Sequence, residues 1–170
     1  SLQKKDGTPV FHDPAAEHGM SATMRHYLAG LLKYADDNMV FLAPYINSYK
    51  RFSAATFAPT KAVWSIDNRT AGYRIVAPGS KSVRIECRVG GSDLNPYLAI
   101  ASQIAAGLKG IEEKLELEPA FSGDAYKADG VREIPGSLRA ATIALRNSSM
   151  LREAMGDAVV DHYVRAAQWE

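Results

Sequence analysis

A stretch of alternating charged and apolar residues, Arg84-Ile85-Glu86-Cys87-Arg88, contains the residue types that bind ions. Successive side chains of a β-strand point to opposite faces, so one face would carry a glutamate between two arginines and the other would belong to a core. Two interpretations fit this pattern. One is a surface ladder of ion pairs, which are common and weak. The other is a pocket floor, where Glu86 holds a divalent cation and the arginines hold anions.

Positive charge gathers around this stretch. The chain has 170 residues and a formal net charge of +1. Between Asn47 and Asp93 it has eight cations against three anions, a local net charge of +5 that leaves −4 for the remainder. A basic middle in a nearly neutral protein favours a local anion site over a nucleic-acid-binding surface.

Composition excludes several other classes. A hydrophobic content of 46% and a charged content of 23% are ordinary for a soluble globular protein. The single cysteine, Cys87, excludes an internal disulfide and fits a reducing compartment; its apolar face predicts an inert core thiol. No apolar run reaches the ~18 residues of a membrane span, and no signal peptide opens the chain. We therefore expect a cytoplasmic protein without a membrane partner.

The spacing of apolar residues predicts the elements that position the charges. Helical spacing begins at Ser21 and runs to about Leu42. Short strands are predicted near Ala62–Ile66 and Tyr73–Val76, and Pro78-Gly79 turns the chain into the charged stretch. The three strands should form an antiparallel meander. The fold class we predict is α+β, an antiparallel sheet backed by helices.

The second half of the chain reads as mostly helical. Asp93 is expected to cap a helix that has Pro96 in its first turn. The stripe expected to face the core comprises Tyr97, Ala101, Ile104, Leu108, Ile111 and Leu115. A turn-rich connection, 116–136, precedes three packing helices at Ser137–Arg146, Ser149–Met155 and Asp157–Glu170.

Five ordered motifs resemble the catalytic domain of the glutamine synthetase family. They are Asn47-Ser48-Tyr49-Lys50-Arg51, Ala58-Pro59, Asp67-Asn68-Arg69-Thr70 with Arg74, the 84–88 stretch, and Asn95-Pro96-Tyr97-Leu98-Ala99. The resemblance runs from about Ser1 to Glu113 and implies a glutamine synthetase/guanido kinase-like fold. It predicts one catalytic domain, incomplete at its N-terminus, with a sheet and active-site half at 1–116 and a helical tail at 117–170.

The resemblance implies a role for each matching residue. Arg51 and Arg88 are similar to the arginines that hold the carboxylates of glutamate, and Glu86 to a ligand of a catalytic Mg²⁺ or Mn²⁺. The implied ATP contacts are Arg69 and Arg74, which grip the phosphates and the transferring γ-phosphoryl group, together with Lys81 and Ser1.

These roles agree with the chemistry of amide formation. A carboxylate oxygen is a poor leaving group, so ATP must first convert the glutamate γ-carboxylate to an acyl phosphate, which ammonia or an organic amine then attacks. Arginines bind the carboxylates and phosphates bidentately, and carboxylates hold the metal ions. Cationic stabilisation of phosphoryl transfer is worth about 10³–10⁵ in rate.

One position departs from glutamine synthetases proper. The family carries a glutamate just before Ala-Pro that accepts a proton from ammonium, and here the residue is Phe57. A phenyl ring cannot accept that proton, but it can contact an alkyl chain or a cationic amine. The run Thr56-Phe57-Ala58-Pro59 resembles the γ-glutamylpolyamine synthetase branch, so Phe57 is a candidate for the amine pocket. The alternative is an aromatic residue that fills the core.

A second departure concerns completeness. Only Glu86 is a candidate metal ligand on this chain, so we expect the 170 residues alone to be inactive and to be a piece of a longer protein. The resemblance implies a ring-shaped homo-oligomer with active sites at subunit boundaries.

Three other classes remain open at this point. A degenerate relative that binds or regulates would also carry Phe57. A single-strand nucleic-acid binder would interleave cations with aromatics, as this chain does around Arg51 and Trp64, but its basic residues occupy under a third of the length. A phosphagen-kinase-like phosphotransferase would share the arginine-rich phosphate site, although the Asn-Ser-Tyr-Lys-Arg run favours the ligase.

Overall fold

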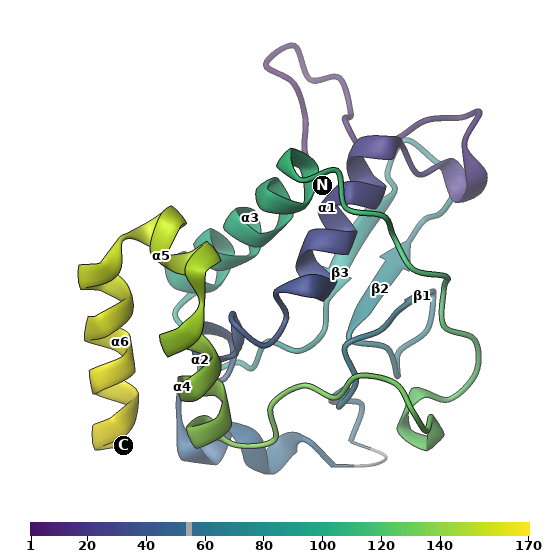
Figure 1. Cartoon of the computed structure of the whole chain (residues 1–170). Helices are drawn as coiled ribbons and strands as arrows, with labels where there is room; N and C mark the ends of the chain where they lie inside the picture. The colour runs from purple at the N-terminus through teal and green to yellow at the C-terminus, as the bar shows by residue number, and fades with distance from the viewer. Residues whose placement is uncertain (54–55) are drawn as a thin grey trace.

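A small sheet lies on one side of the molecule, and helices and long loops surround it (Figure 1). The computed structural model describes residues 1–53 and 56–170. Strands β1 (Trp64–Ile66), β2 (Tyr73–Val76) and β3 (Arg84–Cys87) lie in the order β1-β2-β3. β2 and β3 are antiparallel, with Arg74 opposite Glu86. The α+β class and the backing of the sheet by helices are confirmed.

The sheet is mixed, which corrects the expected antiparallel meander. β1 and β2 run parallel, with Trp64 opposite Tyr73. The connection between them, 67–72, returns the chain to the starting end of β1 before β2 begins. Asp67 opens this connection with φ of 45°, and the Asn68 carboxamide oxygen accepts from the backbone and hydroxyl of Thr70. Because β1 has only three residues, a short connection can span its length and restore its direction.

The helices form two groups (Figure 1). α1 and α3 lie beside the sheet, and α4, α5 and α6 lie beyond them. Their bounds are α1 (Ala22–Lys33), α2 (Met39–Leu42), α3 (Pro96–Glu112), α4 (Leu138–Asn147), α5 (Ser149–Met155) and α6 (Asp157–Trp169), with 3-10 helices η1 (Glu17–Gly19), η2 (Ile46–Arg51) and η3 (Ala125–Lys127). The three C-terminal helices are confirmed, whereas the helix predicted to run to Leu42 is divided into α1 and α2.

The contact between α1 and α3 depends on glycines. A Cβ on Gly110 would lie 2.2 Å from the His26 carbonyl oxygen, and one on Gly107 would lie 2.1 Å from the Tyr27 ring. The core stripe predicted for α3 is therefore wrong in part. Its small residues face the interior, while Tyr97 is 85% exposed and Leu108 is 52% exposed. The expected cap is also wrong, because Asn95, not Asp93, accepts from the first backbone N–H groups of α3.

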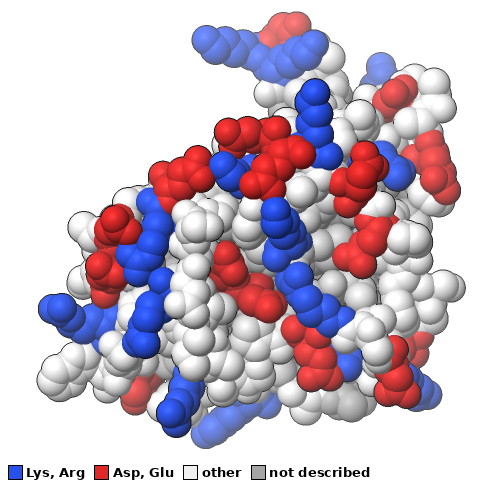
Figure 2. All heavy atoms as spheres, viewed as in Figure 1, with Lys and Arg blue, Asp and Glu red and all other residues white. Residues whose placement is uncertain are grey.

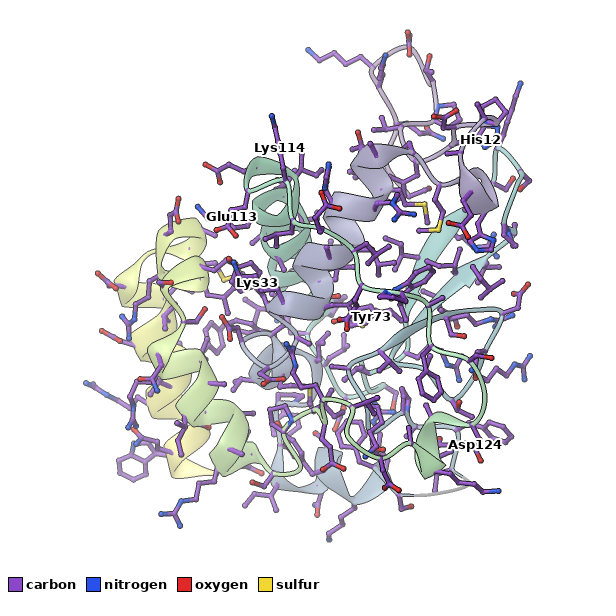
Figure 3. The ribbon with its side chains drawn as sticks, turned by 45° about the vertical axis from the view of Figure 1, so that its right-hand side comes forward. His12, Lys33, Tyr73, Glu113, Lys114 and Asp124 are labelled. Carbon is purple, nitrogen blue, oxygen red and sulfur yellow. The ribbon has the colours of Figure 1, made fainter. Side chains whose placement is uncertain are left out.

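The core lies between the sheet and the helices. Tyr73 and Ile75 of β2 are fully buried, and the Tyr73 hydroxyl donates to the Leu31 carbonyl of α1 at 3.2 Å (Figure 3). Arg132, in the connection after α3, joins the end of α1 to the segment that leads into β1. Its guanidinium donates to the carbonyls of Leu32 and Lys33 at the end of α1, and its own carbonyl accepts from the Ala62 N–H.

The charge distribution on the surface is mixed. Figure 2 shows lysines and arginines interspersed with acidic residues over the face in view. A nucleic-acid-binding surface needs a patch or stripe of one sign, which this face lacks. Among the residues that the structure describes, no helix combines the length and apolar content that a membrane span requires.

Candidate active site

Glu86 stands between two arginines on the polar face of the sheet. Its carboxylate lies 3.2 Å from Arg74 Nη1 and 3.1 Å from Arg88 Nη1. The antiparallel register brings Arg74 across from Glu86, and the two-residue period of a strand puts Arg88 on the same face. The structure thus brings together three of the predicted site residues, while the ligands assigned to them stay predictions.

These ion pairs are neither fully exposed nor fully buried. The side chains of Arg74 and Arg88 are 20% and 14% exposed, and that of Glu86 is 40% exposed. Arg74 has a second carboxylate, because its Nη2 lies 3.2 Å from Asp67 Oδ1. The guanidiniums are therefore fixed in place, and the accessible carboxylate of Glu86 can still bind another ion.

The connection 67–72 reaches this cluster through its backbone. Arg88 Nε donates to the Arg69 carbonyl at 3.1 Å. The Arg69 side chain itself is exposed, and it lines an open hollow of about 560 Å³ together with His18 and Asp67. The backbone of Arg69 thus belongs to the cluster, whereas its guanidinium does not contact Glu86 among the described residues.

Arg51 is held differently from the arginines of the sheet. It ends η2, its Nη2 donates to the Val89 carbonyl, and its guanidinium lies 4.6 Å above the Phe52 ring. No carboxylate of the described residues lies within ion-pair distance of it. Burial lowers the pKa of Arg51 from its ordinary value, an effect that the charge of Asp93 opposes. This partly desolvated cation has capacity for an anionic ligand.

Phe57 lies on a loop attached to both Arg51 and Arg88. The Thr56 hydroxyl donates to the Arg51 carbonyl at 2.8 Å, and Arg88 Nη2 donates to the Phe57 carbonyl at 3.2 Å. The Phe57 residue is 64% exposed, so the interpretation of a core-filling aromatic is wrong. Its neighbour Ala58 is buried instead. Residues 54 and 55 of this loop lie outside the described residues.

Lys81 and Ser1 are not joined to the cluster. Lys81 is exposed in the turn between β2 and β3. Ser1 lines a small cavity with Ile85 and Cys87, which belong to the apolar face of β3. Neither residue makes a hydrogen bond or ion pair with Glu86 among the described residues. Their predicted contacts with ATP therefore rest on the family resemblance alone.

Sequence reasoning missed the segment 121–126, which it treated as a connection. Asn68 Nδ2 donates to the Gly123 carbonyl at 2.8 Å, and the Ala125 N–H donates to the Thr70 hydroxyl at 2.9 Å. The Tyr126 hydroxyl donates to the Ala58 carbonyl at 3.1 Å. The segment thus contacts both loops that border the cluster, and Figure 3 shows Asp124 at the start of η3. An aromatic residue after a capping aspartate was the only signal.

The described residues fit only part of a divalent-metal site. They contain no group of three His, Cys, Asp or Glu side chains that could hold an ion. Mg²⁺ takes about six oxygen ligands, several of them water and substrate phosphate. Glu86 can supply one such oxygen because its carboxylate is accessible, so further carboxylates would have to complete the site.

The chain matches the family described as "Glutamine synthetase, catalytic domain" over residues 1–170. This match includes the C-terminal helices, which lie beyond the motifs that carry the resemblance. A gamma-glutamylethanolamide synthetase, GlnA4, of Streptomyces coelicolor is 48% identical over 170 residues, covering 100% of this chain and 36% of that protein. A glutamate–isopropylamine ligase of Pseudomonas sp is 37% identical, covering 100% of this chain and 38% of its own length.

Glutamine synthetases are similar as well. That of Thermus thermophilus is 41% identical over 98% of this chain and 39% of its own length. Among solved structures, "GmaS/ADP complex-Conformation 1" has a TM-score of 0.87 and 27% identity over 98% of this chain and 40% of that one. "Apo GmaS without ligand" has a TM-score of 0.84 and 29% identity, over 98% and 39%. The chain therefore spans well under half the length of the relatives it matches.

Proposed function

Because this chain belongs to the glutamine synthetase catalytic-domain family, we propose that the protein containing it is an ATP-dependent ligase that joins glutamate to an organic amine. The observation that carries the proposal is the grouping of Glu86 with Arg74 and Arg88 on one face of the sheet, beside the Phe57 loop. A reaction among a carboxylate, a triphosphate and an amine needs such closely placed cations and an accessible carboxylate.

The arginines divide into those assigned to glutamate and those assigned to ATP. Arg51 and Arg88 bind the carboxylates of glutamate, and Arg51 suits this role because no carboxylate of the described residues lies within ion-pair distance of it. Arg74 and Arg69 contact the ATP phosphates, with Lys81 and Ser1 as further nucleotide contacts. Glu86 supplies one oxygen to a divalent ion, which when bound would neutralise phosphate charge during transfer.

The amine is the part of the reaction for which Phe57 matters. The exposed phenyl ring of Phe57, whose backbone carbonyl accepts a hydrogen bond from Arg88, cannot take a proton from ammonium, but it offers an apolar surface and a π-face to an alkylamine. The names of two relatives, an ethanolamide synthetase and an isopropylamine ligase, support a small organic amine as the substrate.

The test is steady-state kinetics on the full-length protein with ATP, glutamate and one of four amines: ethanolamine, isopropylamine, putrescine or ammonium. We expect kcat/KM for at least one organic amine to exceed that for ammonium by more than about tenfold, the scale of one cation–π contact in a desolvated site. Preference for ammonium would refute the choice of amine. ATP turnover with none of them would favour a binding or regulatory relative.

A substitution at Phe57 sharpens this test. Phe57→Glu restores the carboxylate expected in glutamine synthetases, so it should shift the preference toward ammonium. Tyr97→Glu is the matched control, because Tyr97 is an exposed aromatic at the start of α3, 85% accessible. The control should leave the order of amines unchanged.

A further inference from the structure

Two consecutive carbonyls of the Phe57 loop accept hydrogen bonds from distant side chains. Arg88 Nη2 donates to the Phe57 carbonyl at 3.2 Å, across 31 residues of sequence. The Tyr126 hydroxyl donates to the Ala58 carbonyl at 3.1 Å, across 68 residues. The loop is therefore held from two sides, once by an arginine of the cluster and once by the segment 121–126.

The backbone of this loop requires such support. Phe57 has φ of 57°, in the left-handed region that residues with a Cβ rarely adopt. Such a conformation persists only where surrounding contacts determine it. The neighbouring Ala58 is restricted to extended conformations because it precedes Pro59. A hydrogen bond at each carbonyl supplies the missing constraint.

Tyr126 is itself fixed in position. Asp124 Oδ1 accepts from the Tyr126 N–H at 3.0 Å, which sets the start of η3. The hydrogen bonds from Asn68 to Gly123 and from Ala125 to Thr70 then tie this segment to the connection 67–72. The backbone carbonyl of Arg69, in that connection, accepts a hydrogen bond from Arg88 Nε. The phenol of Tyr126 therefore has a defined place relative to the cluster.

We propose that Tyr126 is a positioning residue for amine selection: its hydroxyl fixes the Ala58 carbonyl and thereby keeps Phe57 beside Arg88. The inference rests on the proposed function and adds to it the residue that sets the place of the amine-binding side chain. Tyr126 contacts no substrate in this scheme. Loss of its hydroxyl should raise KM for the amine and leave KM for ATP and glutamate nearly unchanged.

The test is Tyr126→Phe in the full-length protein, which removes one oxygen and keeps the ring. We expect KM for the organic amine to rise about fivefold, the scale of one neutral hydrogen bond, with KM for ATP and glutamate within twofold of wild type. The matched control is Tyr27→Phe. The Tyr27 hydroxyl also donates to a backbone carbonyl at 3.1 Å, that of Gln103, but between α1 and α3. The Tyr27→Phe variant should leave all three KM values unchanged.

A second measurement does not depend on activity. Chymotrypsin cleaves after exposed aromatic residues in mobile loops, so cleavage after Phe57 should be several times faster in Tyr126→Phe than in wild type or Tyr27→Phe. Equal cleavage rates, or equal changes in every KM for both variants, would overturn the proposal. If the wild-type protein forms no γ-glutamyl amide, the ligase assignment fails, and the cleavage rates still decide whether Tyr126 holds the loop.

Discussion

The polar face of the sheet and the contact between α1 and α3 are built in opposite ways. On the sheet, Arg74, Glu86 and Arg88 are placed by charged contacts of 3.1–3.2 Å that remain partly accessible to solvent. Between the helices, Gly30 and Gly110 bring two backbones together without a side chain, and a Cβ on Gly30 would lie 2.8 Å from the Gly110 Cα. One region depends on charge and the other on close packing.

The difference indicates which region can adapt to a ligand. A guanidinium that faces a half-exposed carboxylate can exchange part of that contact for a phosphate or an incoming carboxylate at little cost. A close-packed backbone contact has no alternative arrangement. We therefore expect substitutions on the sheet to change activity, and substitutions between the helices to change stability.

Gly110→Ala should have the largest effect. The added Cβ would meet the His26 carbonyl at 2.2 Å and the Gly30 amide nitrogen at 2.7 Å, and both are backbone atoms that cannot turn away. We expect a loss of about 3 kcal/mol in the free energy of unfolding, although alanine favours a helix over glycine by ~1 kcal/mol. Denaturant unfolding of the full-length protein measures it. Gly136→Ala, where a Cβ meets nothing within 4 Å, should be nearly neutral.

Glu86→Gln should lower activity and have little effect on stability. The substitution keeps the size of the side chain but removes the charge that faces Arg74 and Arg88. We expect ligase turnover to fall by roughly 100-fold, the scale of losing one preorganised electrostatic contact, with a change in stability below about 1 kcal/mol. Glu133→Gln is the control, since Glu133 pairs with Lys61 and, among the described residues, makes no ion pair with Arg74 or Arg88. Equal turnover in the two variants would contradict the role of Glu86.

Arg51→Lys tests the arginine that makes no ion pair within the described part of the chain. Lysine keeps the charge but not the planar fork, so KM for glutamate should rise about tenfold while KM for ATP stays near wild type. Arg152→Lys is a matched control, because Arg152 contacts Asp157 and Asp161 in the C-terminal helices. A rise in both KM values for Arg51→Lys would mean a general disturbance of the site and no specific glutamate contact.

Glu113→Gln should have the smallest effect. Its carboxylate lies 2.6 Å from Lys33 Nζ, joining the ends of α1 and α3 (Figure 3). The hydrogen bond from Lys33 lowers the pKa of Glu113, so its contribution is present above the ordinary glutamate pKa and is lost as the pH falls through the lowered value. For an exposed pair this is below about 1 kcal/mol. Urea midpoints of wild type and variant should differ at pH 7 and converge as the pH falls below the lowered pKa of Glu113.

The grouping of Arg74, Glu86 and Arg88 was predictable because both relations that create it are local. Strand alternation puts residues 86 and 88 on one face, and the antiparallel register of β2 and β3 supplies residue 74. The direction of β1 was not predictable, since it depends on how the connection 67–72 folds back. Hydrophobic spacing alone could not distinguish a meander from a parallel pair.

The orientation of α3 is a second feature that could not be predicted from the sequence. Large apolar residues normally face the interior, but here Gly107 and Gly110 permit a closer approach to α1, and Tyr97 and Leu108 remain outside. The contact of Tyr126 with Ala58 is a third such feature. It joins residues 68 positions apart through one backbone carbonyl, and no periodicity in the sequence marks such a pair.

Arg132 has a consequence for the order in which the protein is made. Its guanidinium closes the end of α1 across 100 residues, so α1 and the three strands are synthesised before that partner exists. Translation adds about 5–20 residues per second, which leaves the nascent helix end bonded to water for seconds. A chain paused before residue 126 would contain every arginine of the cluster while still lacking the phenol that secures the Ala58 carbonyl.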